Sequence, residues 1–142
     1  MNILRYVLLW LLSFIFTSLI DAALHLVIFK KPYVQGLKPL ARMKGGKMAL
    51  KGGPGLLSQV LVVTCLVLLV FLAADGSSLL AAVVGALAGV LAISVYGVTN
   101  SALFKDWNLT LTVLEFVWGP ILGALSGLFV HWLKTWLIVA PR

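Results

Sequence analysis

The chain has 142 residues, of which 62% are hydrophobic and only 11% are charged, and its formal net charge is +7. Soluble domains are about 45–50% apolar, so this composition excludes an ordinary water-soluble protein and indicates a single membrane domain. Cys65 is the only cysteine. A disulfide within the chain and a metal site built on cysteines are therefore excluded.

Four long apolar runs predict an all-α integral membrane protein, a bundle of four transmembrane helices. They cover about residues 3–29, 56–74, 79–99 and 109–131, and a transmembrane helix needs roughly 20 apolar residues. The first run could also be a signal peptide. It is too long for the apolar region of one, so we expect it to be a retained helix.

The loop of residues 30–55 holds most of the positive charge: Lys30, Lys31, Lys38, Arg42, Lys44, Lys47 and Lys51. Basic residues gathered in one loop between apolar spans are typical of a membrane protein, so we do not expect nucleic-acid binding. The side chains either contact anionic lipid headgroups or serve only to fix the topology. Prolines and glycines interrupt the loop, which is either unstructured or contains a short interfacial helix over Val34–Met43.

Charge distribution also predicts the orientation. The loops 30–55 and 100–107 carry eight basic residues, and the opposite side carries three, Arg5, Lys134 and Arg142. Because loops rich in Lys and Arg stay in the cytoplasm, both termini are expected on the non-cytoplasmic side, with a bacterial inner membrane as the predicted location.

Two polar residues lie within the first span. Asp21 and His25 are four positions apart and therefore share one face of a helix. A charge at the centre of a span costs about 3 kcal/mol, so both side chains are expected to face the interior of the bundle. They either satisfy each other as a structural pair or take part in proton handling or ligand contact.

Small residues recur every four positions in the last two spans. Gly85 and Gly89 follow Ala81 on a stripe that continues to Tyr96 and Asn100, and Glu115 begins a second stripe. The second stripe continues through Gly119, Gly123 and Gly127. Small residues at this spacing let transmembrane helices approach closely, so both stripes are predicted to pack against helices and to carry their polar residues inward.

The polar residues of the spans are predicted to converge in the cytoplasmic half of the bundle. The candidate ligand or proton site consists of Asp21, His25, Tyr96, Asn100, Glu115 and Trp118. We expect Glu115 to be protonated and hydrogen-bonded to Tyr96 or Asn100. The alternative is that these groups only hold the helices together, since hydrogen bonds between helices are common in lipid.

The run from Tyr96 to Asn100, then Trp107, then Glu115 with Trp118 and Gly119, resembles predicted bacterial membrane proteins grouped as domain of unknown function 2177. Asp21 and Tyr33 match an early Asp and Tyr of that family, and the likeness covers most of the chain. The chain departs from the pattern at residues 97–99, where the family has Tyr-Asp, at Glu115, where it has aspartate, at His25 and in the segment 43–55. The resemblance implies four spans and no known activity.

Three classes of function fit these features. The first is a small bundle that binds or transports a ligand at the polar cluster. The second is an accessory subunit, packed as a homo-oligomer or against a larger membrane complex. The third, a lipid-modifying enzyme, has least support, because no nucleophile is paired with a base and the two histidines lie at opposite ends of the spans. No catalytic residue, metal or cofactor is predicted, and the lipid bilayer is the expected partner.

Overall fold

A computed structural model describes residues 3–45, 47–49, 51–74 and 76–139. The predicted fold class is confirmed: the molecule is all-α, and four of its helices are long and apolar enough to cross a membrane. These spans are Ile3–Ile28, Gly52–Ala73, Ser78–Leu103 and Leu109–Val139.

Three of the four spans contain a π-helical turn. The first span is α1 (Ile3–Ala23) followed by η1 (Leu24–Ile28), and the second is α3 (Gly52–Ala73). The third is α4 (Ser78–Gly89), η2 (Val90–Ser94) and α5 (Val95–Leu103), and the fourth is α6 (Leu109–Lys134) with η3 (Thr135–Val139). Between the first two spans lie α2 (Lys30–Leu37) and a hairpin of β1 (Met43–Lys44) and β2 (Lys47–Met48).

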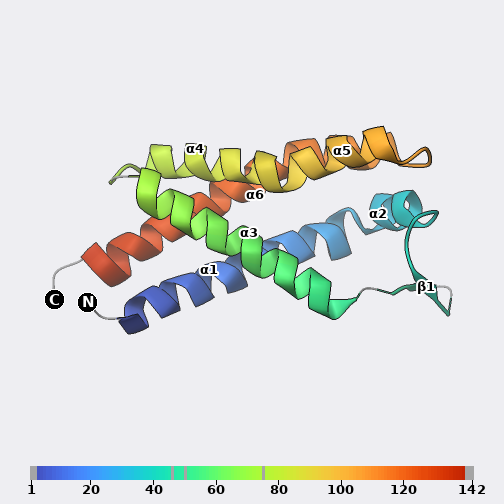
Figure 1. The fold of residues 1–142 in the computed structure, drawn as a ribbon. Helices are drawn as coiled ribbons and strands as arrows, with labels where there is room; N and C mark the ends of the chain where they lie inside the picture. Colours follow the sequence, from blue (N-terminus) through green and yellow to red (C-terminus); the bar gives the residue numbers. More distant parts are fainter. Residues whose placement is uncertain (1–2, 46, 50, 75, 140–142) are drawn as a thin grey trace.

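α6 is the helix around which the others are arranged, since it contacts α1, α3, α4 and α5. α1 begins and η3 ends at one end of the bundle, whereas α2 and the hairpin lie at the other (Figure 1). The main apolar core lies toward the end of the bundle where the first span begins and the last span ends. It includes Leu9, Val63, Leu66, Val70, Val130 and Leu133. Most of the buried polar residues lie outside this core.

The predicted helix ends need four corrections. α3 begins at Gly52 rather than residue 56, because Pro54 falls in its first turn, where a missing N–H costs nothing. The helix of the basic loop is Lys30–Leu37 rather than Val34–Met43, since Pro39 has no N–H with which to continue the helical hydrogen bonds. The third span continues past residue 99 to Leu103, and the last span continues past residue 131 to Val139.

The basic side chains of the loop project from α2 and the segment that follows it. Lys30, Lys31, Lys38, Arg42, Lys44 and Lys51 are all exposed. Lys47 lies in β2, and its side chain is outside the part that the structure describes, as are Leu50, Asp75 and Arg142.

α4 and α6 pack backbone to backbone through the two stripes of small residues. A methyl group added at Gly119 would lie 2.7 Å from the carbonyl oxygen of Gly89, and one added at Gly123 would collide with the carbonyl oxygen of Gly85. Gly127 meets the carbonyl of Ala81 in the same way. Only glycine at these positions lets the two helix backbones lie this close together.

The π-helical turn η2 changes which residues of the third span face α6. Gly85 and Gly89 are buried before it, Ser94 is buried at its end, and Gly97 and Asn100 are buried after it. The extra residue of a π-turn advances the buried face by one position. The prediction that Tyr96 faces inward is therefore wrong, since Tyr96 is 57% exposed and Gly97 takes its place, whereas Asn100, predicted on the same stripe, is buried.

Candidate functional site

Asp21 is the centre of the polar cluster on α1. Its Oδ1 atom accepts hydrogen bonds from Trp118 Nε1 at 3.1 Å and from His25 Nδ1 at 3.1 Å. His25 Nδ1 also lies 2.8 Å from the Asp21 backbone carbonyl. A neutral imidazole with its proton on Nδ1 can make both contacts. Because both side-chain contacts end on Oδ1, the other carboxylate oxygen of Asp21 is left for a further donor.

A second pair, Tyr33 and Glu115, joins α2 to α6. The Tyr33 hydroxyl donates to Glu115 Oε1 at 3.4 Å, and the Tyr33 ring meets the His25 ring edge-on with centroids 4.4 Å apart. Burial, together with the nearby Glu115 carboxylate, raises the pKa of the Tyr33 hydroxyl above its ordinary value. Tyr33 therefore remains a hydrogen-bond donor at physiological pH.

The placement of Glu115 differs from the sequence prediction. It is buried, but its described partner is Tyr33 rather than Tyr96 or Asn100. Its Oε2 atom lies where a side chain at residue 97 would begin, so Gly97 leaves the space for it. Glu115 Oε2 and Asn100 Nδ2 have no hydrogen-bond partner among the described residues.

The Ser94 hydroxyl contacts a backbone carbonyl, that of Phe116, which lacks its helical hydrogen bond because of Pro120. A proline at position 120 has no N–H to donate to the carbonyl of Phe116, one turn earlier. The buried Ser94 hydroxyl lies 3.4 Å from that carbonyl oxygen and 3.2 Å from the carbonyl oxygen of Glu115. η2 therefore supplies the polar contact that α6 lacks beside Glu115.

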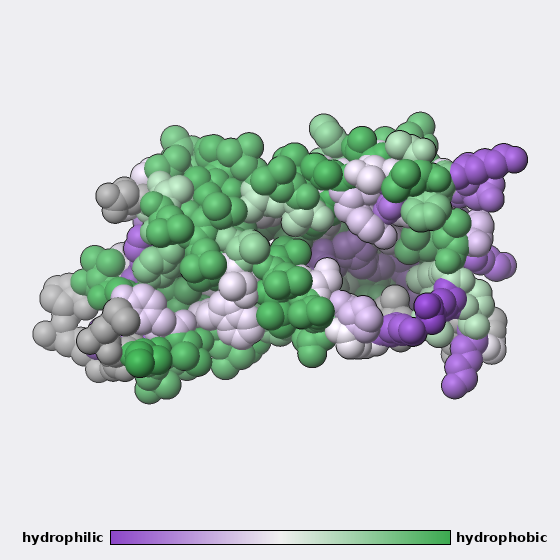
Figure 2. Space-filling model, viewed as in Figure 1, coloured by the Kyte–Doolittle hydropathy of each residue, from purple (hydrophilic) through white to green (hydrophobic). Residues whose placement is uncertain are grey.

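A polar cavity of about 230 Å³ lies beside Asp21. It is lined from α1 and η1 by Asp21 and His25, from α3 by Ser58 and Gln59, and from α5 by Tyr96. Hydrophilic surface is visible in a hollow between the apolar surfaces of α3 and α5 (Figure 2). No Lys or Arg of the described chain lines this cavity.

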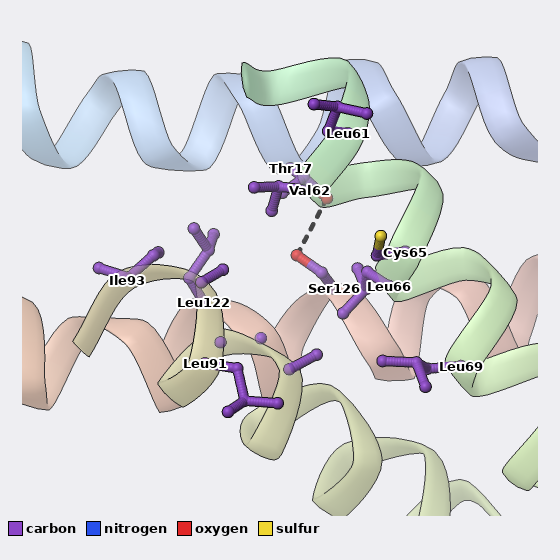
Figure 3. A pocket seen from close by; sticks show the side chains of 14 residues that line it. Thr17, Leu61, Val62, Cys65, Leu66, Leu69, Leu91, Ile93, Leu122 and Ser126 are labelled. Atoms are coloured by element: carbon purple, nitrogen blue, oxygen red, sulfur yellow. Dashed lines mark hydrogen bonds between the residues drawn. The ribbon is translucent and has the colours of Figure 1, made fainter. Parts of the chain in front are cut away.

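An apolar cavity of about 360 Å³ adjoins the polar one and lies farther from α2 along the bundle. Leu61, Cys65 and Leu69 of α3 face Leu91 and other residues of η2 across it (Figure 3). The hydrogen bond of 3.0 Å from the Thr17 hydroxyl to Ser126 Oγ joins α1 to α6 at its wall (Figure 3).

The six predicted site residues do not form one contiguous group. Asp21, His25 and Tyr96 line the polar cavity, and Trp118 is bonded to Asp21. Glu115 and Asn100 are buried but do not line this cavity, and Glu115 is bonded to Tyr33. The predicted site therefore mixed residues that line the polar cavity with buried polar residues that do not.

Sequence reasoning left Tyr33 and Gln59 out of the candidate site. Tyr33 follows the first span in a segment expected to be a loop, so no helical spacing connects it to Glu115. The available signal was its match to the early Tyr of the resembled family. Gln59 lies near the start of the second span and lines the polar cavity. The signal for it was a polar side chain at the cytoplasmic end of an apolar run.

Among the residues that the structure describes, no three His, Cys, Asp or Glu side chains come together as metal ligands. What the cluster offers chemically is a carboxylate with a free oxygen, an imidazole and a side-chain amide around one cavity.

The family model described as "Predicted membrane protein (DUF2177)" matches residues 6–132. The chain belongs to this family. The resemblance found in the sequence is thereby confirmed, and the family description together with the four apolar spans shows that this member is a membrane protein. No curated protein and no solved structure matches the chain.

Within this DUF2177 protein, four of the residues that carry the family resemblance form two contacts between distant segments. Asp21 is bonded to Trp118, and Tyr33 is bonded to Glu115, although each pair is separated by most of the chain. Gly119, which follows Trp118, forms the close contact with Gly89. One region of the bundle therefore unites the segments by which the family resemblance was found.

Proposed function

We propose that this protein binds a small ligand with a cationic or hydrogen-bond-donating group in the polar cavity. The observation that carries the proposal is Asp21, a carboxylate inside a span that faces a cavity with one oxygen free. The His25 ring and the Trp118 indole both contact Oδ1, so they orient the carboxylate and leave its other oxygen open to the cavity. A donor from a ligand would complete its hydrogen bonding.

The cavity chemistry supports a cation over an anion. Its described lining has a carboxylate and no Lys or Arg, and the exposed Tyr96 ring lines the same cavity. Aromatic faces attract ammonium groups, by about 0.5–2 kcal/mol. An anion would instead meet the Asp21 carboxylate.

The position of the cavity in the bundle suggests from which side of the membrane a ligand reaches it. It lies toward the end of the bundle that carries α2 and the basic hairpin. If the basic loop is cytoplasmic, as the distribution of Lys and Arg favours, the ligand reaches the site from the inner half of a bacterial inner membrane. The exposed lysines of the loop then lie where anionic headgroups are found.

The test uses the tryptophan that contacts Asp21. Butylammonium chloride is titrated into the protein in lipid nanodiscs, with sodium chloride at equal ionic strength as the control. Because Trp118 donates to Asp21, occupancy of the site should change its fluorescence in a saturable way. The ligand-dependent change should vanish in Trp118→Phe and weaken by about tenfold or more in Asp21→Asn, as expected for loss of a charged hydrogen bond.

Stability separates this proposal from a purely structural cluster. Asp21→Asn and Glu115→Gln keep the size and acceptor oxygen of each side chain, so both variants should accumulate in the membrane as the original protein does. Failure of both to accumulate, with no butylammonium response in the original protein, would show that the cluster only holds the helices together. Recovery of a stable larger assembly in mild detergent, with no such response, would favour an accessory subunit.

A further inference from the structure

The polar and apolar cavities adjoin each other. They share five lining residues from all four spans: Thr17, Val62, Ala92, Ile93 and Leu122. We call the two adjoining cavities the joined site. A ligand seated at Asp21 therefore lies next to the apolar cavity, with only the side chains that border both between them.

The joined site has a polar end and an apolar end. α3 lines it from Ser58 and Gln59 at the polar end to Leu69 at the apolar end. At 1.5 Å of rise per residue this stretch of helix is about 16 Å long. Such a shape matches a molecule with a compact head and an extended apolar chain.

The site also opens sideways toward the surrounding lipid. α3 packs on α1, α4 and α6, while α5 packs on α6, and the hollow between α3 and α5 is visible on the molecular surface (Figure 2). Leu61 is 56% exposed and Leu91 is 68% exposed although both line the apolar cavity. A ligand dissolved in the bilayer could enter between these helices without crossing water.

We infer that the ligand is a single-chain amphiphile with a cationic head, held with its head at Asp21 and its chain in the apolar cavity. The inference rests on the proposed function and adds the class of ligand to it. The chain gains little from leaving lipid, which is as apolar as the cavity. Its part is to hold the head in the membrane and to fill the space beside Cys65.

Cys65 provides a direct measurement of the chain. It is the only cysteine and lines the apolar cavity, so a bound chain should slow its alkylation by a membrane-permeant maleimide. Cys65 is also exposed at the surface of α3. The matched control is the double variant Cys65→Ser with Leu68→Cys, which moves the thiol to another exposed position of α3, one outside both cavities. Dodecylamine, dodecanol, dodecanoate and butylammonium are compared in nanodiscs, the three long-chain probes at equal mole fractions in the lipid.

The expected result is that dodecylamine slows alkylation of Cys65 but not of the thiol in the double variant. Dodecanol and dodecanoate should protect about tenfold less effectively, and Asp21→Asn should reduce protection by dodecylamine to that level, because each change removes a charged hydrogen bond. Equal protection by the three heads, or equal effects at the two thiol positions, overturns the inference.

The proposed function can survive that failure. If butylammonium alters Trp118 fluorescence but dodecylamine leaves Cys65 alkylation unchanged, the head site is retained and the amphiphile is rejected. If neither butylammonium nor dodecylamine has any effect, both proposals are rejected.

Discussion

Ser94 shows how one hydroxyl can support a whole region of the bundle. Replacing it with alanine leaves the Phe116 carbonyl without the contact that compensates for Pro120. We expect Ser94→Ala to lower the free energy of unfolding by about 1–2 kcal/mol, measured by unfolding in sodium dodecyl sulfate. Ser101→Ala, at an exposed hydroxyl bonded only to the nearby Val98 carbonyl, should change it little.

A double-mutant cycle identifies the cause. Pro120→Ala restores an N–H that can reach the Phe116 carbonyl, so the Ser94→Ala loss should be smaller in that background. An undiminished loss in the Pro120→Ala protein would contradict the assignment of Ser94 to this carbonyl.

Gly97 is the residue that lets Glu115 lie against α5. A methyl group at residue 97 would collide with the Glu115 carboxylate, so Gly97→Ala should displace Glu115 and weaken its bond to Tyr33. We expect a loss of about 1–3 kcal/mol in the free energy of unfolding. Gly55→Ala, whose added methyl has nothing within 4 Å, is the control.

Repeating the Gly97→Ala measurement in a Glu115→Ala background tests whether the collision with the carboxylate causes the loss of stability. If the collision is the reason, Gly97→Ala should cost much less in a Glu115→Ala background, where no carboxylate stands in the way. A cost that is the same in both backgrounds would assign the effect to the α5 backbone instead.

At the scale of elements, η2 decides which face of the third span is buried. The four-residue spacing of Ala81, Gly85 and Gly89 predicted their contact with another helix, and the structure places them against α6. The same spacing failed beyond Gly89, because nothing in an apolar run such as Val90–Ser94 announces a π-turn. Tyr96 was therefore predicted inward and lies on an exposed face.

Deletion of a single residue tests the role of this turn. Removing the exposed Leu91 should convert η2 to a regular α-helical turn while both flanks keep their buried faces, so the variant should fold and accumulate. Removing Val83 from α4 rotates every residue on one side of it by about 100° and should prevent accumulation. Membrane levels of the two variants provide the comparison, and equal loss of both would contradict the account of η2.

Among the elements, α2 was the least predictable from the sequence. Its position depends on contacts far apart in the chain: Tyr33 with Glu115, and Gly36 against Leu111, where an added methyl would lie 2.9 Å from the leucine side chain. Periodicity within a short segment carries no information about such contacts. Apolar run length, in contrast, predicted all four spans, because lipid thickness imposes it directly.

At the scale of the whole molecule, the charge distribution predicts the orientation. We expect a reporter that is active only in the cytoplasm to be inactive when fused after Arg142 and active when inserted at Gly45 of the hairpin. The reason is the excess of Lys and Arg on the side of the 30–55 loop. Activity at the C-terminus with none at Gly45 would reverse the orientation and place the cavity in the outer half of the membrane.

The whole bundle has a packed core at one end, and its two cavities lie between that core and α2. Leu9, Val70, Val130 and Leu133 fill the end at which the first span begins and the last one ends. The cavities are bordered by Asp21 on the side of α2 and by Leu69 on the side of the core. Such a packed core can serve as a scaffold that holds a ligand site.

The most direct measurement is an experimental structure of the protein extracted from its own membrane into nanodiscs, without added ligand. The account predicts elongated non-protein density that begins beside the free carboxylate oxygen of Asp21 and continues between α3 and η2 toward Leu69. Closure of α3 onto α5, with Gln59 and Tyr96 filling the space beside Asp21, would contradict it.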